Sequence, residues 1–276
     1  MWNVRIGTIF PGLFPGPLGA SCIGKKLGEL WSLEVDDLRQ FASNKHKSID
    51  DEPFGGGGGM VIRPDIVDTW LSSHNLQVNP SGGKINKDTL QKIVYVSPRG
   101  RVFSNKIAKE LIKQDLCILC GRYEGVDARV LEHWGIEEIS IGDFVLHGGE
   151  VASMVIVETC LRYLDGMIKA HSVENDSFET GLLEFDHFTR PAEWIPIGEK
   201  KVYNVPKVLR SGNHSEINEW RNQNSMKITK ENRPDLLKKY LKEERDKLKM
   251  TETAKKPAVL KRKVGKSVKN INKEKE

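Results

Sequence analysis

Apolar and polar positions along the first 164 residues predict strands and helices in turn. A continuous apolar run of strand length, typical of a strand buried on both faces, occupies residues 116–120, and strands are also expected at residues 2–10 and 93–96. A short strand and turn are expected at residues 33–41, and another turn at residues 97–101. Helical spacing of apolar residues predicts helices at residues 18–31, 64–71, 105–114 and 150–164. This order argues for an α/β fold on an open, mainly parallel sheet.

Two of the predicted helices carry recognisable start signals. Pro64 suits the first turn of its helix, and Ser104 is a reasonable N-cap for residues 105–114. Between these helices, residues 76–88 are polar and contain glycine, which indicates a surface loop.

Residues 116–149 form the segment on which the functional interpretation depends. The pattern is apolar strand, glycine turn, short helix, second strand and second glycine turn. The glycines that follow the strand-like runs are Gly121, Gly125, Gly142, Gly148 and Gly149. Glycine lets a backbone turn tightly or approach a ligand closely. The spacing alone therefore leaves open a binding site or ordinary sheet turns, and no nucleotide-binding glycine motif is present.

The second half of the chain differs in character. Residues 1–164 are expected to form the sheet domain, and the polar residues 165–178 a linker. Residues 179–250 are expected to form a small helical domain with polar-faced helices at 216–225 and 234–248, and residues 251–276 a tail.

The positive charge of the chain is concentrated in this tail. The net charge is +5, residues 251–276 contribute +6, and the remaining residues carry about −1. A basic segment so poor in large apolar residues is expected to be disordered and to add non-specific RNA affinity. It does not specify a substrate.

The cysteines and the N-terminus favour a cytoplasmic protein. Four cysteines are too few and too scattered for a disulfide framework, and Cys117 and Cys120 are expected to be buried thiols on opposite faces of one strand. The N-terminus resembles a signal peptide only superficially, because prolines at 11, 15 and 17 interrupt its apolar region. No apolar run is long enough to span a membrane.

The literal strings are more specific than the spacing. CGRYEGVDARV followed by SIGDFVLHGGE resembles two signature segments of bacterial tRNA (guanine-37-N1)-methyltransferases, members of the SPOUT class. DDEPFGGGGGM, YVSPRGR, NDSF and SGNHSEINEWR resemble further motifs of the same family. In the glycine-rich loop, Glu52 and Gly58 depart from the family pattern. The apolar residues on both sides of this loop favour a loop held close to other structure.

The resemblance implies a fold, a substrate and a mechanism. It implies a SPOUT-type trefoil knot, S-adenosylmethionine clasped by the knot loops, tRNA as substrate and a homodimer. Because N1 of guanine is protonated at neutral pH, methyl transfer to it needs a base. The resemblance assigns that base to Asp176 and assigns stabilisation of negative charge on O6 to Arg162. Without it, Asp176 reads as a turn residue and Arg162 as a helix-end cation.

The remaining site residues also come from the resemblance. Those expected to bind the cofactor are Tyr95, Val96, Ser97, Pro98, Gly121, Tyr123, Glu124, Gly125, Ser140, Ile141, Gly142, Asp143, Phe144, Val145, Leu146, Gly148 and Gly149. Those expected to contact tRNA are Asp50, Ser177, Ser211, Asn213 and His214. Glu124 is also a candidate contact to the guanine or to Mg²⁺, a cofactor that the resemblance raises although no metal-ligand pattern is legible. His147 is expected at the pocket rim without a catalytic role.

Two other functions are compatible with parts of the pattern. One is a related SPOUT enzyme that methylates ribose or ribosomal RNA. The other is a non-catalytic RNA-binding protein that uses the basic tail. NDSF and the SGNH segment argue against the first, and the presence of Asp176 and Arg162 argues against the second.

Overall fold

The computed structural model describes residues 1–74, 91–168 and 176–254. The chain divides into two compact units, Met1–Val173 and Glu174–Glu276, and each is considered separately below. The predicted loop at 76–88 and most of the predicted tail lie outside the described residues.

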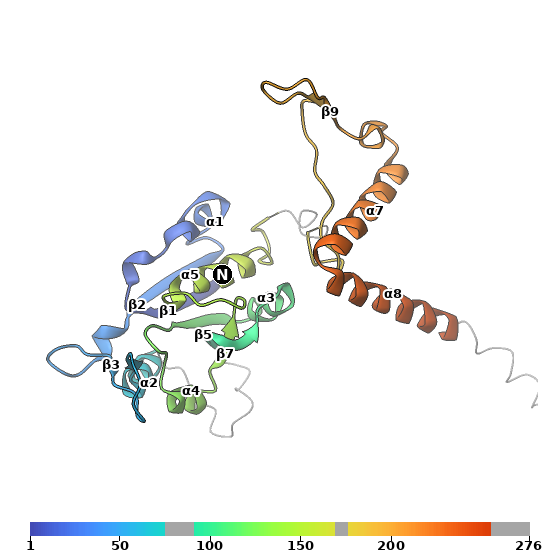
Figure 1. Cartoon of the computed structure of the whole chain (residues 1–276). Helices are drawn as coiled ribbons and strands as arrows, with labels where there is room; N and C mark the ends of the chain where they lie inside the picture. Colours follow the sequence, from blue (N-terminus) through green and yellow to red (C-terminus); the bar gives the residue numbers. More distant parts are fainter. Residues whose placement is uncertain (75–90, 169–175, 255–276) are drawn as a thin grey trace, which may run out of the picture. The chain divides into compact units, whose positions relative to one another are not determined.

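The first unit is built on a five-stranded parallel sheet with the order β2-β1-β6-β5-β7 (Figure 1). Its strands are β1 (Trp2–Thr8), β2 (Trp31–Asp37), β5 (Gln91–Val102), β6 (Asp115–Cys120) and β7 (Glu137–Ser140). In register, Val4 faces Leu116 and Val94 faces Ile118. The prediction of an α/β fold on a mainly parallel sheet is confirmed. A separate antiparallel pair joins β3 (Asp50–Asp51) to β4 (Val61–Ile62).

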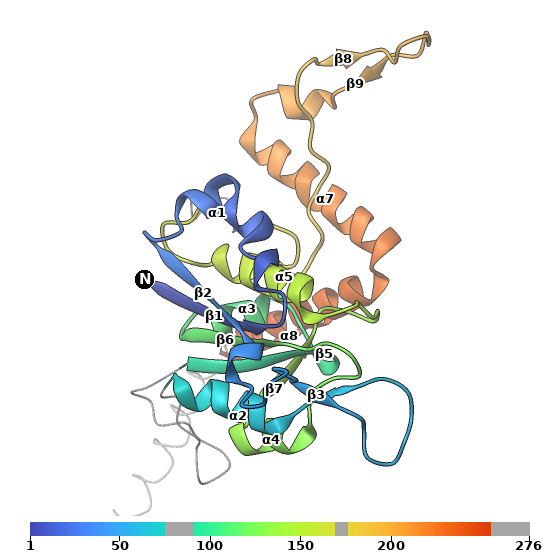
Figure 2. The ribbon, with the colours of Figure 1, turned by 90° about the vertical axis from the view of Figure 1, so that its left-hand side faces the viewer.

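Helices cover both faces of the sheet (Figures 1 and 2). One face packs against α3 (Asn105–Leu111) and α5 (Gly149–Leu161), and the other against α2 (Pro64–Ser73) and α4 (Ala128–Trp134). Short elements complete the two units: α1 (Ser21–Lys25), η1 (Pro11–Leu13), η2 (Gly16–Gly19), η3 (Leu38–Phe41) and η4 (Lys207–Arg210).

Strand β6 shows why its sequence is a continuous apolar run. Leu116, Ile118 and Cys120 pack in the core under α3 and α5, whereas Cys117 and Leu119 pack in the core on the opposite face. Cys117 and Cys120 are therefore buried on opposite faces, as predicted.

The predicted helix at residues 18–31 is wrong in most of its length. The helical part of this segment is confined to η2 and the five-residue α1, and Trp31 already begins β2. The backbone is extended at Ala20, where η2 ends, and Gly28 has a φ of +83°, so the helix does not continue across either position. Gly24 lies inside α1, where a Cβ would lie 2.1 Å from the carbonyl oxygen of Gly19. Apolar spacing alone does not register such backbone contacts.

The predicted turn at residues 97–101 is also wrong. Strand β5 continues through this stretch to Val102, with a register shift against β7 between Val96 and Arg101. Gly100 permits the continuation, because a Cβ there would lie 2.4 Å from the backbone of Glu138 and Ile139.

The helix boundaries are close to those predicted. Pro64 begins α2 at its first turn, and Arg162 caps the C-terminus of α5. Helix α3 ends at Leu111, three residues before the predicted end, and Ser104 occupies the N-cap without a side-chain capping hydrogen bond.

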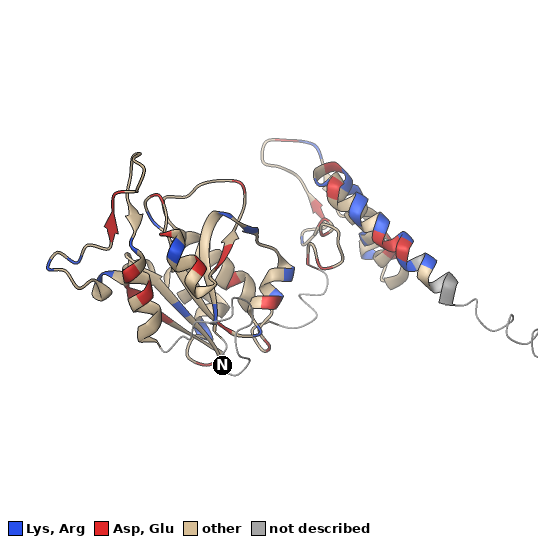
Figure 3. Cartoon of the chain, turned by 90° about the horizontal axis from the view of Figure 1, so that it is seen from below, with Lys and Arg blue, Asp and Glu red and all other residues tan. Residues whose placement is uncertain are grey.

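The second unit contains two long helices and a hairpin that the sequence pattern did not predict. The helices are α7 (His214–Asn232) and α8 (Pro234–Ala254), and the hairpin pairs β8 (Glu193–Trp194) with β9 (Tyr203–Asn204). Both helices are longer than predicted, and the first four residues assigned to the tail belong to α8. Acidic and basic residues are interspersed along both helices (Figure 3). Within the described ranges, no helix is long and apolar enough to cross a membrane.

Candidate functional site

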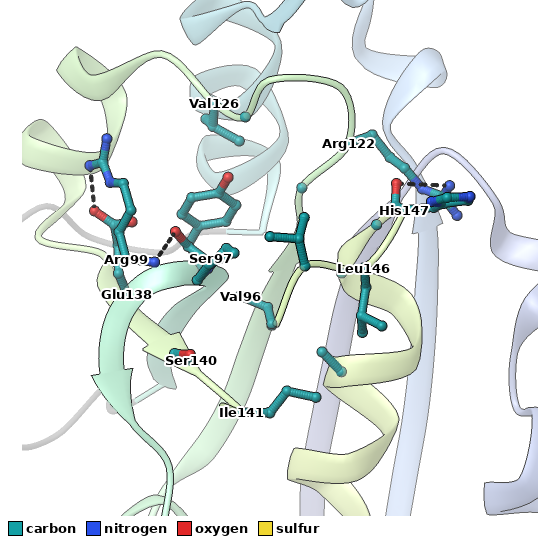
Figure 4. Close-up of a pocket in the computed structure, with 18 of the residues that line it drawn as sticks. Val96, Ser97, Arg99, Arg122, Val126, Glu138, Ser140, Ile141, Leu146 and His147 are labelled. Carbon is teal, nitrogen blue, oxygen red and sulfur yellow. Dashed lines mark hydrogen bonds and ion pairs between the residues drawn. The ribbon is translucent and has the colours of Figure 1, made fainter. Parts of the chain in front are cut away.

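A pocket of about 330 Å³ lies at the carboxyl ends of β6 and β7, beside residues 95–99 of β5 (Figure 4). Ligands of open α/β sheets bind outside the carboxyl ends of the strands, so this is the expected place for a site. Its walls are residues 95–99, residues 121–126 and residues from 138 to 149, with Leu131 of α4 and Ala152 of α5 completing the lining. The volume falls in the range of small-molecule sites.

Glycines bring the second and third walls together. The amide of Gly149 donates to the carbonyl oxygen of Gly121 over 2.9 Å. A Cβ on Gly149 would lie 2.9 Å from Cα of Cys120, and a Cβ on Gly121 would lie 2.6 Å from the ring of Tyr95. Glycine is thus required by close packing at both positions, and backbone groups line the pocket between them.

The loop from β7 to α5 forms the third wall. The Ser140 hydroxyl donates to the carbonyl oxygen of Gly142 over 3.1 Å, which closes the start of the loop. Phe144 and Val145 then lie exposed at the pocket. Gly142 has a φ of +146°, in the region that favours glycine. This wall offers backbone groups and apolar side chains to a ligand.

Arg122 joins two pocket walls to the first strand. Its Nε donates to Oε1 of Glu150 over 3.1 Å, and its Nη2 lies 2.9 Å from Oε2. Its Nη1 donates to the carbonyl oxygen of His147 over 3.3 Å (Figure 4). Glu150 is buried and also accepts from the Thr8 hydroxyl of β1 over 2.7 Å. The guanidinium lies 4.4 Å from the ring centre of Phe10.

Glu138 places a carboxylate in the opposite wall. Its Oε1 accepts from Nη2 of Arg99 over 2.9 Å (Figure 4). Its Oε2 is buried and accepts no hydrogen bond from the described residues. Burial, and then the Glu138 carboxylate, raise the pKa of Tyr95, so this phenol stays protonated and neutral in the wall. An acceptor and a neutral hydroxyl thus lie side by side.

The glycine-rich loop before α2 meets the second wall at its C-terminal end. The amide of Glu124 donates to the carbonyl oxygen of Met60 over 2.9 Å. A Cβ on Gly59 would lie 2.5 Å from the Glu124 side chain. Burial, and then the carboxylate of Asp50, raise the pKa of Tyr123, whose backbone has the unusual φ of +56°. The expectation that this loop is held against other structure holds only at Gly59; from Gly55 to Gly58 an added Cβ would meet nothing within 4 Å, and Phe54 is 99% exposed, so for most of its length the expectation is wrong.

Sixteen of the seventeen residues predicted to bind the cofactor line this pocket, and Asp143 is the exception. Asp143 is exposed in the third wall without lining the cavity. Sequence reasoning missed several lining residues, namely Arg99, Arg122, Val126, Leu131, Glu138 and Ala152. Arg99 lies in the string YVSPRGR and Arg122 in CGRYEGVDARV, so their positions in these family-like strings could have indicated them. His147 lines the pocket, as expected for a residue at its rim.

The predicted catalytic residues fall in different units. Arg162 is an exposed residue of the first unit, whereas Asp176 and Ser177 are half-buried in the second. The Ser177 hydroxyl accepts from the amide of Glu184 over 3.0 Å, and the amide of Phe178 donates to the carbonyl oxygen of Leu182 over 2.8 Å. These bonds form a compact turn directly after Asp176.

Two of the predicted tRNA contacts have structural roles inside the second unit. The Asn213 side chain caps α7 by accepting from the amides of Ser215 and Glu216, and the Ser211 hydroxyl accepts from the amide of Asn213. His214 is the first residue of α7, and Asp50 begins β3 in the first unit. Among residues 1–74, 91–168 and 176–254, no cluster of His, Cys, Asp and Glu is suited to hold a metal ion.

A parallel α/β unit with a pocket walled by glycine turns at the carboxyl edge of its sheet is the arrangement of an α/β protein that binds a small ligand. The sequence pattern of one family, described as tRNA (Guanine-1)-methyltransferase TrmD, matches residues 2–239. This chain belongs to that family.

Similar proteins carry the same description. A tRNA (guanine-N(1)-)-methyltransferase of Rhodospirillum rubrum is 47% identical over 237 residues, which cover 85% of this chain and 92% of the relative. Proteins with that name from Ruegeria pomeroyi and Ehrlichia ruminantium are 43% and 45% identical, and the matches cover 87% and 86% of this chain and 94% and 95% of the relatives.

Proposed function

We propose that this protein transfers a methyl group from S-adenosylmethionine to N1 of guanosine 37 in tRNA. The observation that carries the proposal is that the motif turns shared with the family converge on one pocket. Membership of a tRNA (guanine-N1)-methyltransferase family supports the reaction class. The methyl donor, the position in tRNA and the base are the finer parts of the proposal.

The pocket suits S-adenosylmethionine in size and chemistry. The cofactor would supply an electrophilic methyl group on a sulfonium. Backbone groups between Gly121 and Gly149, where a Cβ would collide with neighbouring atoms, would read the nucleoside edge. The carboxylates of Glu124 and Glu138 suit the hydrogen-bond donors and positive charge of this ligand.

Asp176 is the proposed general base, and Arg162 the proposed stabiliser of charge on guanine O6. A guanidinium donates hydrogen bonds and stays charged at all working pH values, which suits it to an oxyanion that forms as N1 loses its proton. The residues lie in separate units. We therefore propose that tRNA binding assembles the site, and that a homodimer completes each pocket.

Further properties belong to the same proposal. The first unit has a trefoil knot formed by the segments around the pocket, and the protein works in the cytoplasm. Mg²⁺ takes part together with the bound RNA. Asp50, Ser177, Ser211, Asn213 and His214 contact tRNA.

The decisive experiment uses unmodified tRNA transcripts with guanosine at positions 36 and 37 and labelled S-adenosylmethionine. Digestion and mass spectrometry should give 1-methylguanosine at position 37. Methylation of ribose or of another base would refute the proposal. Binding of tRNA with no methyl transfer would favour the non-catalytic alternative.

The role of Asp176 is tested by replacing it with Ala. Single-turnover methyl transfer should be lost, while calorimetry should show nearly unchanged S-adenosylmethionine affinity, because the base acts on the RNA. Asp165→Ala is the matched control, since Asp165 is an exposed carboxylate of the predicted linker. Equal loss of turnover and of cofactor affinity in Asp176→Ala would mean that Asp176 is structural.

A further inference from the structure

The hairpin formed by β8 and β9 lacks a core of its own. Each strand has two residues, and all four are exposed. From Glu193 to Asn204 only Pro196 is even half-buried. Within the second unit, the hairpin extends as an arm beyond the end of α7 (Figures 1 and 2). An isolated two-stranded hairpin is marginally stable in water, so an arm of this kind is expected to gain order from something that covers it.

Two aromatic rings form a platform on this arm. Trp194 and Tyr203 are directly paired across the strands, their ring centres lie 5.6 Å apart, and their planes are inclined by 39°. Trp194 is 55% exposed and Tyr203 is 44% exposed. Side chains of this size usually bury most of their surface. An exposed aromatic pair therefore indicates a contact surface rather than part of the fold.

The arm itself, residues 193–204, carries two glutamates and two lysines, and its flanks add Arg190, Lys207 and Arg210, so the surroundings of the arm are basic whereas the rest of residues 1–250 is net acidic. Residues 189–210 contain five basic and two acidic side chains, a net charge of +3. Since residues 1–250 carry about −1 in total, the other residues of that range sum to about −4. Lys201 lies 4.5 Å from the ring centre of Tyr203, so a cation stands directly beside the platform.

We propose that this hairpin is an RNA-contacting arm, in which Trp194 and Tyr203 stack on an unpaired base of the tRNA while Lys200 and Lys201 contact its phosphates. Single-stranded nucleic acids are bound by this combination of stacking platform and positive charge. A partner protein or a second copy of this chain is a weaker fit, because neither explains the local positive charge. The inference rests on the proposed function only in taking tRNA as the RNA.

The test measures tRNA binding of the full chain by fluorescence anisotropy over a series of salt concentrations. Trp194→Ala and Tyr203→Ala should each weaken binding about tenfold, the effect expected for loss of one stacked base. Trp194→Phe should restore most of the affinity. The Lys200→Ala/Lys201→Ala variant should lower the logarithmic salt slope by about 1.4 to 1.8, at 0.7 to 0.9 for each phosphate contact.

Matched controls separate this role from general effects. Ile197 is a fully exposed apolar residue of the same arm, and Ile197→Ala should leave tRNA affinity within about twofold. Lys25→Ala/Lys113→Ala removes two exposed lysines of the first unit and should leave the salt slope unchanged. S-adenosylmethionine affinity should be the same in all variants.

Three outcomes would overturn the inference. The first is a wild-type tRNA affinity retained by the aromatic and lysine variants. The second is a sharp fall in thermal midpoint in Trp194→Ala, which would make the pair structural. The third is a change in oligomeric state by light scattering without a change in tRNA affinity, which would assign the arm to a second copy. Failure of the proposed function is distinct, since the wild-type protein would then not methylate tRNA.

Discussion

Replacing Arg122 with Met leaves the buried carboxylate of Glu150 without its cation. The Glu150 side chain is 1% exposed and that of Arg122 is 20% exposed, so water has little access to replace the lost partner. Breaking a buried pair from one side costs about 3 to 5 kcal/mol. In a unit of this size, at about 2 to 4 °C for each kcal/mol, the thermal midpoint should fall by about 6 to 20 °C.

The assay is denaturant unfolding followed by tryptophan fluorescence. Trp31 and Trp70 are fully buried in the first unit and report its unfolding. Glu150→Gln keeps an oxygen that accepts from Thr8, so it should destabilise the protein less than Arg122→Met. The double variant Arg122→Met/Glu150→Gln should be more stable than Arg122→Met alone, because no unpaired charge remains. Additive effects within about 0.5 kcal/mol would refute this coupling.

An exposed pair provides the control. Arg233 donates two hydrogen bonds to Asp235, over 3.0 and 2.8 Å, at the start of α8. Both side chains are solvent-exposed, so water replaces a missing partner. Arg233→Ala should leave the unfolding midpoint of the first unit unchanged. A similar loss of stability in both variants would mean that burial is not what makes the Arg122 pair important.

Three further predictions address the pocket, the thiols and the tail. Gly149→Ala must displace α5 from β6, because its Cβ would lie 2.9 Å from Cα of Cys120. Calorimetry should show an S-adenosylmethionine affinity at least about tenfold lower. Gly12→Ala, where a Cβ meets nothing within 4 Å, should leave that affinity unchanged. Burial raises the pKa of the Cys160 thiol to about 12, from an ordinary value of 9.0. Its contribution to stability is therefore complete below pH 9 and is lost as pH rises from about 9 to 12, by up to about 1.4 kcal/mol for each pH unit. Between pH 8 and pH 10, denaturant titrations should show a smaller loss of unfolding free energy in Cys160→Ala than in the unsubstituted protein. Deleting residues 255–276 should leave the thermal midpoint unchanged and lower the salt slope of tRNA binding by about 0.7 to 0.9 for each lost phosphate contact. A lower midpoint with an unchanged slope would contradict that expectation.

The elements that sequence patterns predicted well are those whose environment is uniform along their length. Strand β6 is buried on both faces, so every position from Leu116 to Cys120 is apolar and the run is legible without context. Helix α5 is bounded by Gly149 and capped by Arg162, and most of its side chains are buried. In both elements, the apolar residues of the element itself indicate that it is buried.

The elements that were missed depend on distant contacts. Pro98 and Gly100 read locally as a turn, yet β5 continues because β7, about forty residues later, pairs with it past the register shift. The arm of β8 and β9 has strands of two residues, too short for an alternating pattern. Its aromatic pair is visible only once Trp194 and Tyr203 are placed opposite each other.

The pocket shows the same division. Its walls were predicted through the resemblance, because the motif strings contain the glycines and small residues that lie at its turns. Arg122 and Glu138 act through side chains whose partners, Glu150 and Arg99, are 28 and 39 residues away along the chain. A run of glycines can be recognised in the sequence alone. A charge pair can be recognised only once the fold places its two residues next to each other. The side chains that position and polarise the pocket are therefore the part of the site that required the structure.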